Sequence, residues 1–210
     1  NTTLQRLYTD EALFSDYRTR LGIIGWGLFA GADYTSADKR LTASAGVRAD
    51  GCDYSARMAR PWHQLSPRAS VRYAFSEAWS VSGSAGLYYQ LPPMTALGFK
   101  QDGVLVNEAL RYMRVWQFGA GAEWRLRDRL AVTLTGFFKK YGDVPLSVED
   151  GIPLSCKGND YGVVGNEALR SEAEGRAYGV EVLARWQIPG RVNIVGSATL
   201  FRSEYRRGPG

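Results

Sequence analysis

The sequence predicts an all-β protein, an antiparallel meander of about eight strands that forms part of a transmembrane outer-membrane β-barrel. Two observations lead to this fold class. Apolar and polar residues alternate along most segments, and the connections between segments alternate between very short and very long. Alternation with a period of two puts the apolar side chains of a strand on one face. Outer-membrane barrels have short turns at one end and long loops at the other, which matches the second observation.

Short turns divide the chain into four predicted hairpins, and their residues are 36–39, 76–78, 127–128 and 189–190. The stretches that join one hairpin to the next are long, polar and rich in Gly and Pro, at about residues 55–64, 90–113 and 142–174. The first strand, about residues 21–34, and the last, about 191–205, alternate less strictly. The six between them alternate clearly, with apolar faces along Leu41–Ala49, Ala69–Phe75, Trp79–Leu87, Trp116–Trp124, Leu130–Phe138 and Tyr178–Ile188.

Aromatic residues concentrate near the short turns, whereas the strand centres carry Ala, Val, Leu and Gly. A second aromatic set lies toward the long loops. Two aromatic bands around an apolar band are typical of membrane interfaces, where amphipathic rings lie at headgroup level. A soluble β-fold with the same face as its core is an alternative, because alternation alone does not separate the two. The predicted interface aromatics are Tyr34, Tyr73, Phe75, Trp79, Trp124 and Trp186.

The opposite face carries charged residues, among them Arg48, Arg72, Glu123, Glu181 and Arg185. These side chains would be costly in a dry core without partners, so this face is expected to meet a wet barrel interior.

Composition excludes several other classes of protein. The chain has 210 residues with 45% hydrophobic and 22% charged residues, which is typical of one folded domain. Glycines interrupt its longest apolar run, residues 21–32, so no transmembrane helix is expected. The net charge of +5 comes from basic residues spread singly, which argues against a nucleic-acid partner. No signal peptide is recognised at Asn1-Thr2-Thr3.

No catalytic or metal site is predicted. His63 is the only histidine, and no third residue is recognisable that would complete a Ser-His arrangement. One histidine and two distant cysteines give no metal-ligand spacing, and no cofactor is expected. Cys52 and Cys156 both lie toward the long loops, which leaves two alternatives, a disulfide or two free thiols.

Ligand contacts are expected on the long loops, because binding residues concentrate on loops held by a rigid scaffold. The candidates combine rings with hydrogen-bonding groups, and interface anchoring is the alternative role for each. They are Tyr88, Gln90, Arg111, Arg114, Tyr141, Asp160 and Tyr161.

Several phrases resemble the barrel of TonB-dependent outer-membrane receptors, of the kind common in Bacteroidetes. They are residues 66–75, 79–82 and 85–92, then 136–141 with 145–147, and finally 175–181, in the same order as in that family. The resemblance covers about residues 20–205. It implies a 22-stranded barrel, closed by a plug domain, that takes up a scarce nutrient and is energised through TonB.

The chain lacks a recognisable plug, a TonB box and a final strand that ends in an aromatic residue. Residues 1–210 are therefore expected to be a single internal segment of the barrel wall in the bacterial outer membrane. Its expected partners are outer-membrane lipid, the remainder of the barrel and its plug, TonB, and a nutrient ligand. A small structural or adhesive barrel that closes on itself is the alternative, and it predicts that the first and last strands pair with each other.

Overall fold

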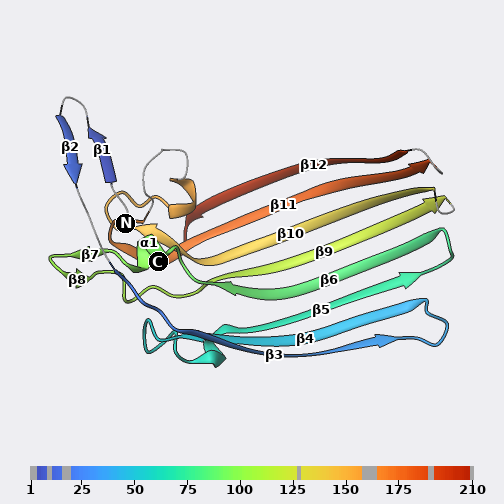
Figure 1. Ribbon diagram of the computed structural model, residues 1–210, viewed down its shortest axis with the longest axis horizontal. Coiled ribbons are helices and arrows are strands. Elements are labelled where there is room, and N and C mark those ends of the chain that lie inside the picture. Colours follow the sequence, from blue (N-terminus) through green and yellow to red (C-terminus); the bar gives the residue numbers. More distant parts are fainter. Residues whose placement is uncertain are drawn as a thin grey trace.

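The computed structural model describes residues 4–8, 11–15, 20–126, 129–157, 165–188 and 192–208, with side chains from residue 20 onward. One eight-stranded antiparallel sheet contains all of its long strands (Figure 1). They are β3 (Gly25–Thr35), β4 (Leu41–Cys52), β5 (Leu65–Ala74), β6 (Trp79–Gln90), β9 (Met113–Leu126), β10 (Leu130–Ser147), β11 (Leu169–Ile188) and β12 (Val192–Arg207). This confirms the predicted all-β meander.

The strands lie in the order β12-β11-β10-β9-β6-β5-β4-β3, so each long strand pairs with its neighbours in the chain. The described hairpin turns, at residues 36–39 and 76–78, lie at one end of the sheet, and the described parts of the long loops lie at the other (Figure 1). Turns 127–128 and 189–190 lie outside the described residues. β3 and β12 form the two edges and do not pair with each other, so the described sheet is open. A ring closed by these two strands, as the small-barrel alternative requires, is not formed.

The register keeps the same alternation across the six inner strands of the sheet. Ala45 pairs with Ala69, which pairs with Ala85, and the row continues through Phe118, Phe138 and Tyr178. We call this side the apolar face. The other side, the polar face, has a row that runs through Ser44, Ser70, Ser84 and Gly119. A shift by a single residue would exchange the faces, so the agreement over the six inner strands favours this register, whereas the edge strand β12 places Arg202 beside Tyr178 on the apolar face.

Two strands are longer than the sequence indicated. β10 continues to Ser147 and β11 begins at Leu169, so the strands pair through Val144–Ser147 and Leu169–Ala173, which were expected in a loop, with irregularities in the register. A bulge between Tyr141 and Val144 contains Asp143, whose φ is +55°. Gly, Asp and Pro close together indicated a loop, but the bulge absorbs the irregular residues and the pairing resumes after it.

Short elements that the sequence pattern did not reveal complete the chain. They are the hairpins β1 (Leu4–Tyr8) with β2 (Glu11–Ser15) and β7 (Lys100–Gln101) with β8 (Val104–Leu105), the helix α1 (Met94–Leu97), and 3-10 turns at Pro61–Gln64 and Leu154–Cys156. Each is too short to show a hydrophobic period. Within the described residues, no helix has the length and apolar character needed to cross a membrane.

Candidate functional site

The predicted interface aromatics all lie on the apolar face near the short turns. Trp79 and Trp124 are cross-strand partners with ring centroids 6.4 Å apart, and Tyr73 and Phe75 lie 5.0 Å apart. A second band nearer the long loops includes Phe118 and Phe138, 6.5 Å apart. Trp124 and Phe118 are six residues apart on β9, or about 20 Å along the strand. That spacing suits the apolar band of an outer-membrane barrel, about 25 Å tall.

The large side chains of the apolar face are exposed in this structure. Trp79 is 52% exposed, Trp186 50%, Leu134 51% and Leu200 77%. An exposed apolar face that extends over eight strands needs a covering, and lipid supplies one where two aromatic bands bracket it.

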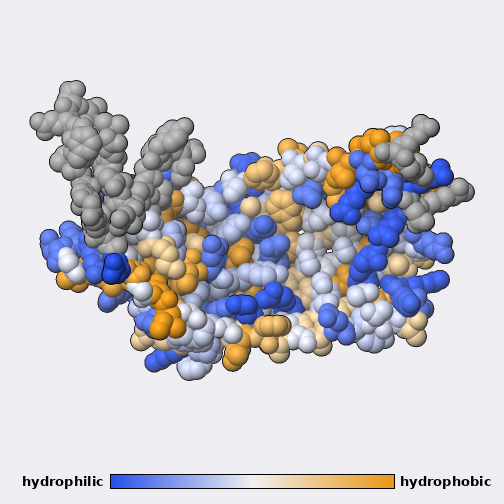
Figure 2. Space-filling model, in the orientation of Figure 1, coloured by the Kyte–Doolittle hydropathy of each residue, from blue (hydrophilic) through white to orange (hydrophobic). Residues whose placement is uncertain are grey.

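The polar face is hollow and charged. Arg48 pairs with Asp50 at 2.7 Å, and Glu123 accepts from Arg72 at 3.3 Å and Arg125 at 2.6 Å. Figure 2 shows hydrophilic side chains gathered over the middle of the sheet and toward its short-turn ends. All five of these residues are at least partly exposed, as expected for a surface that meets water.

The long loops pack together into a small folded unit at the other end of the sheet. We call residues 53–64, 91–112, 148–157 and 165–168 the cap. Its core contains the fully buried Met58, Ala96 and Leu97 together with Leu110 and Leu154. An apolar core of this kind holds the loops in one arrangement, whereas polar loops without one would be free to move.

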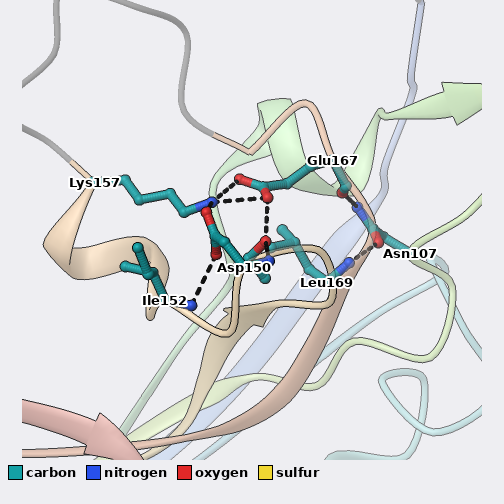
Figure 3. A network of polar contacts seen from close by, with 7 residues as sticks. Asn107, Asp150, Ile152, Lys157, Glu167 and Leu169 are labelled. Atoms are coloured by element: carbon teal, nitrogen blue, oxygen red, sulfur yellow. Dashed lines mark hydrogen bonds and ion pairs between the residues drawn. The ribbon is translucent and has the colours of Figure 1, made fainter.

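Asn107 links two segments of the cap and the first residue of β11. Its side chain is 1% exposed, and its amide nitrogen donates to the carbonyl oxygens of Ala96 at 2.8 Å and Glu167 at 2.9 Å. Its Oδ1 accepts from the backbone N–H of Leu169 at 2.8 Å (Figure 3). All three of these hydrogen bonds are made to the backbone, so the buried amide stabilises one loop geometry, because each backbone group would otherwise be left unpaired.

An ion-pair network beside Asn107, which we call the latch, joins the two sides of the third long loop (Figure 3). Lys157 Nζ lies 2.6 Å from Asp150 Oδ2 and 2.8 Å from Glu167 Oε1, and Ser147 donates to Glu167. The hydrogen bond from Lys157 lowers the pKa of Asp150. Burial alone would lower the pKa of Lys157, but its bonds to Asp150 and Glu167 outweigh burial and raise it.

One tyrosine joins two loops of the cap, and a second contacts Cys52 of β4 beneath it. Tyr54 donates from its hydroxyl to the carbonyl of Leu97 at 2.9 Å, and burial, with Glu108 and Cys52 nearby, raises the pKa of Tyr54 to about 12. Tyr112 is 7% exposed. Its burial is the main cause that raises its pKa well above the ordinary value, and its hydrogen bond with Cys52 is the second cause. Both phenols therefore remain neutral at physiological pH.

The cap covers the end of the polar face. Cys52 follows Arg48 and Asp50 at alternate positions on β4, and it belongs to the same buried cluster as Leu169 of β11. Four strands separate β4 from β11 in the sheet, so the cap spans about 24 Å of sheet at the usual strand spacing. Alternate residues of β11 from Leu169 to Ala177 are buried, which marks the covered side.

The structure brings two of the predicted ligand residues together. Arg111 Nη1 lies 3.1 Å from Asp143 Oδ1, and Arg114 Nε lies 2.9 Å from Asp143 Oδ2. The backbone N–H of Arg111 also donates to Ser171 Oγ at 3.0 Å. The left-handed conformation of Asp143 in the bulge thus places one carboxylate between two guanidinium groups.

The other predicted ligand residues are dispersed. Tyr88 lies on the polar face beneath Arg68, whose guanidinium carbon is 5.4 Å from the ring centroid. Gln90 is exposed at the end of β6, and Tyr141 contacts Tyr205 with ring centroids 5.7 Å apart. Asp160 and Tyr161 lie outside the described residues.

The two cysteines are free thiols, so the disulfide alternative is not the one formed. Cys52 is fully buried with its Sγ 3.8 Å from Met58 Sδ, whereas Cys156 is exposed. Cys52 is enclosed by the cap core, so its thiol does not reach the exposed thiol of Cys156.

His63 shows no catalytic surroundings. Its Nδ1 is buried without a hydrogen-bond partner, and its ring meets Trp62 edge to face at 6.3 Å. The described part of the chain contains no group of three or more His, Cys, Asp or Glu residues arranged to hold a metal ion.

Sequence reasoning missed the residues that organise the loop end, namely Asn107, Asp143, Lys157 and Glu167. For Asp143 the sequence offered one indication, because Asp is among the residues that tolerate a positive φ. Asn107 and Glu167 contact each other 60 residues apart in the chain, and Lys157 contacts partners across one loop, so no short-range pattern marks the three.

An open antiparallel wall with an apolar outer band, a charged inner side and folded loops at one end defines a segment of an outer-membrane β-barrel. The chain belongs to the TonB dependent receptor-like, beta-barrel family, whose model matches residues 2–210. This confirms the resemblance read from the strand phrases and places the chain in a family of outer-membrane transport receptors.

Solved structures with the same fold are similar to this chain at low sequence identity. The FrpB iron transporter from Neisseria meningitidis (F3-3 variant) is 14% identical, with a TM-score of 0.61 over 87% of this chain and 26% of that one. The ferric-catecholate import receptor Fiu from K12 E. coli is 13% identical, with a TM-score of 0.63 over 90% and 29%. The alcaligin receptor FauA from Bordetella pertussis is 16% identical, with a TM-score of 0.55 over 87% and 30%.

This chain therefore spans between a quarter and a third of the length of these structures. A comparison with curated protein sequences gave no match.

Proposed function

We propose that this chain is part of the barrel wall and extracellular loops of an outer-membrane active-transport receptor for a nutrient ligand, energised through TonB. The observation that carries the proposal is the open eight-stranded sheet, whose two edges are unpaired and whose polar face is covered at one end by a folded cap. Unpaired edges on β3 and β12 are templates for further strands. The remainder of a larger barrel, with its plug, would pair with them.

The two unlike faces of the sheet support a proposal for what surrounds the wall. The apolar face with its two aromatic bands would lie against outer-membrane lipid, and the cap would lie outside the cell. Tyr34, Tyr73, Phe75, Trp79, Trp124 and Trp186 would then anchor the wall at the periplasmic interface. The polar face would line the interior, where the plug and the passing ligand meet it.

Ligand contact is assigned to the cap and to the polar face just beneath it. Tyr88, Gln90, Arg111, Arg114 and Tyr141 surround this end of the sheet and combine aromatic rings with hydrogen-bond donors. The similar solved proteins include an iron transporter and a ferric-catecholate import receptor, which supports a scarce nutrient as the cargo. Loops of this length inside a compact fold are usually either functional or disordered, and the described parts of these loops are packed around an apolar core.

Deletion of residues 150–164 from the parent receptor tests the proposal. The deletion removes Asp150, Leu154 and Lys157, so it opens the latch and takes one residue from the cap core. We expect growth on limiting amounts of the transported nutrient to fall strongly while the receptor remains in the outer membrane. Normal growth at normal surface levels would contradict a role for this loop in uptake.

A control deletion belongs at the opposite end of the wall. Shortening the turn at residues 36–39, which joins β3 to β4 away from the cap, should leave nutrient-dependent growth unchanged if surface levels are normal.

A further inference from the structure

Charged side chains gather on the apolar face at its loop end, where the second aromatic band stops. Arg202 of β12 pairs with Tyr178, which lies in the row of that band. One row nearer the long loops, Lys140 of β10 pairs with Arg176 of β11, and Arg176 pairs with Glu204 of β12. We call this group the outer cation patch, and it consists of Lys140, Glu174, Arg176, Arg202, Glu204 and Arg206.

The patch is confined to one sector of the wall. On the same face, strands β3, β4, β5 and β6 carry no charged residue over their described lengths. Arg170 and Glu172 continue the alternate positions of β11 toward the loops, with opposite charges. A general requirement for polar residues near the membrane surface would apply to every strand of the wall. Charge that is concentrated on adjacent strands therefore indicates a particular partner.

The outward surface of the patch is cationic, because its carboxylates are more buried than its guanidinium groups. Glu204 lies 2.6 Å from Arg176 and 2.5 Å from Arg202, and Glu174 lies 3.3 Å from Arg206. The three arginine side chains are 59%, 70% and 76% exposed, whereas the two glutamates are 29% and 32% exposed. Each guanidinium has five N–H donors, so most of them remain for a further acceptor.

Lys140 and Arg176 place two positive charges directly opposite each other on neighbouring strands. The Cβ atoms of such partners lie about 4.5–5.5 Å apart, and like charges in this position destabilise the pairing. Lys140 is exposed and has no ion pair within the part of the chain that the structure describes. Glu204 is already shared by two arginines. An anion bound between the lysine and Arg176 would remove the repulsion.

The patch lies at the depth of lipid headgroups. Arg202 is level with the second aromatic band, and Arg206 lies four residues farther along β12, or about 13 Å. Arg176 Cζ is 5.9 Å from the ring centroid of Tyr178, which keeps this guanidinium beside the band. Aromatic bands mark the boundary between hydrocarbon and headgroups. A further strand paired with β12 would lie beside the patch, so its outward side would stay open.

We propose that the outer cation patch is a binding site for the phosphate groups of an anionic lipid in the outer leaflet. Lys140 and Arg176 bind one phosphate group between them, and Arg202 and Arg206 contact the same headgroup from the next strand. This inference rests on the proposed placement of the wall in the outer membrane and adds a partner on its outer side. An acidic protein would meet the same charge, but the patch borders directly on the apolar band, which favours a lipid.

Native mass spectrometry of the full-length parent receptor in neutral detergent micelles tests the site. The probe is diphosphoryl lipid A, an acylated disaccharide with two phosphate groups, and the fraction of receptor that carries it gives the affinity. Lys140→Gln and Arg176→Gln should each weaken binding about fivefold, the usual contribution of one Lys or Arg near an anionic lipid surface. Lys139→Gln is the matched control, because this neighbouring lysine of β10 lies on the polar face. It should change the affinity less than twofold.

Four results would overturn the lipid site. They are absence of bound lipid A on the wild-type receptor, unchanged affinity in the Lys140 and Arg176 variants, an equal loss in Lys139→Gln, and equal affinity for the same glycolipid without its phosphates. The third would indicate general charge attraction. The fourth would indicate binding through the acyl chains alone and would leave the patch to another partner, such as an acidic protein.

Nutrient-dependent growth separates failure of the lipid site from failure of the proposed function. If the 150–164 deletion abolishes growth while lipid A binding ignores Lys140 and Arg176, transport stands and the lipid site falls. If these two residues control lipid A binding but the deletion leaves growth unchanged, the lipid site stands and the role assigned to the cap loop falls.

Discussion

Gly175 shows how the absence of one side chain shapes the loop end of the polar face. It pairs with Tyr141 on one side and Tyr205 on the other, and the two rings meet at 5.7 Å. A Cβ added at Gly175 would lie 2.4 Å from Tyr205 Cδ1 and 3.2 Å from the carbonyl oxygen of Glu204. The glycine therefore leaves the space that the aromatic pair occupies.

We predict that Gly175→Ala destabilises the refolded protein by about 1–3 kcal/mol, the usual cost of overpacking. Gly196→Ala on β12 is the control, because an added Cβ there meets no atom within 4 Å. Urea unfolding of both variants in lipid vesicles measures the difference. Equal stability of the two variants would show that the ring of Tyr205 moves aside at no cost.

Asn107 gives a second prediction at the scale of one residue. Asn107→Ala should leave the carbonyls of Ala96 and Glu167 and the N–H of Leu169 without their partner, at about 1–3 kcal/mol for each buried group left unpaired. Hydrogen exchange at the Leu169 amide should accelerate at least tenfold. Asn107→Asp keeps the acceptor for Leu169 and should retain more of that protection than the alanine variant; the reverse order would contradict the assigned hydrogen bonds.

At the scale of elements, the cap converts three long loops into one packed unit. Tyr54, Asn107 and Leu169 come from different loops or strands, and each contacts a residue at least 43 positions away in the chain. The latch adds charge to this apolar packing and makes the third loop sensitive to pH.

The latch should be weakened in acid and in strong base. The pKa of Asp150 is lowered, so its contribution is present above its unfolded pKa of about 3.9 and is lost as the pH falls through the lower folded value. The pKa of Lys157 is raised, so its contribution is complete below about 10.4 and is lost as the pH rises through the higher folded value. The latch is therefore fully formed between about pH 5 and 9.

Hydrogen exchange checks this window at the Ile152 amide, which donates to Asp150 Oδ1 at 2.8 Å. Its protection factor, corrected for intrinsic exchange, should be constant from pH 5 to 9 and fall toward pH 3. Lys157→Met should give low protection throughout with little dependence on pH. A wild-type protection factor that stays constant down to pH 3 would rule out the latch as the source of protection.

At the scale of the whole molecule, the two faces of the sheet are assigned to two solvents. Leu134 pairs with Ala122 and Val182 on the apolar face, about midway between the aromatic bands, and Thr135 pairs with Gly121 and Glu181 on the polar face. Adjacent residues of one strand thus report on lipid and on the barrel interior separately.

We predict that Leu134→Arg destabilises the parent barrel by about 2–4 kcal/mol in lipid, the cost of a cation near the bilayer midplane. Thr135→Arg should cost far less, because its side chain lies on the wet face opposite Glu181. Urea titration of both variants refolded in vesicles decides between the faces. Equal costs, or a larger cost at Thr135, would mean that the lipid face is assigned wrongly.

The sequence by itself determined the meander, its two faces and its two unlike ends. These features depend on alternation within a strand and on the length of each connection, as in Leu41–Ala49 and the turn at residues 36–39, and both are local properties of the chain. The end of β10 was misjudged because Gly142, Asp143 and Pro145 indicate a loop, whereas cross-strand pairing with β11 extends the strand through a bulge.

Only the tertiary structure decided which residues meet at the loop end. Asn107 and Glu167 are far apart in the chain, and so are Arg68 and Lys139, which share a row only because four strands align in register. The open edges at β3 and β12 were likewise a property of pairing and not of either strand alone. Contacts of this kind depend on the closure of long loops and on a shared register, which no single stretch of sequence encodes.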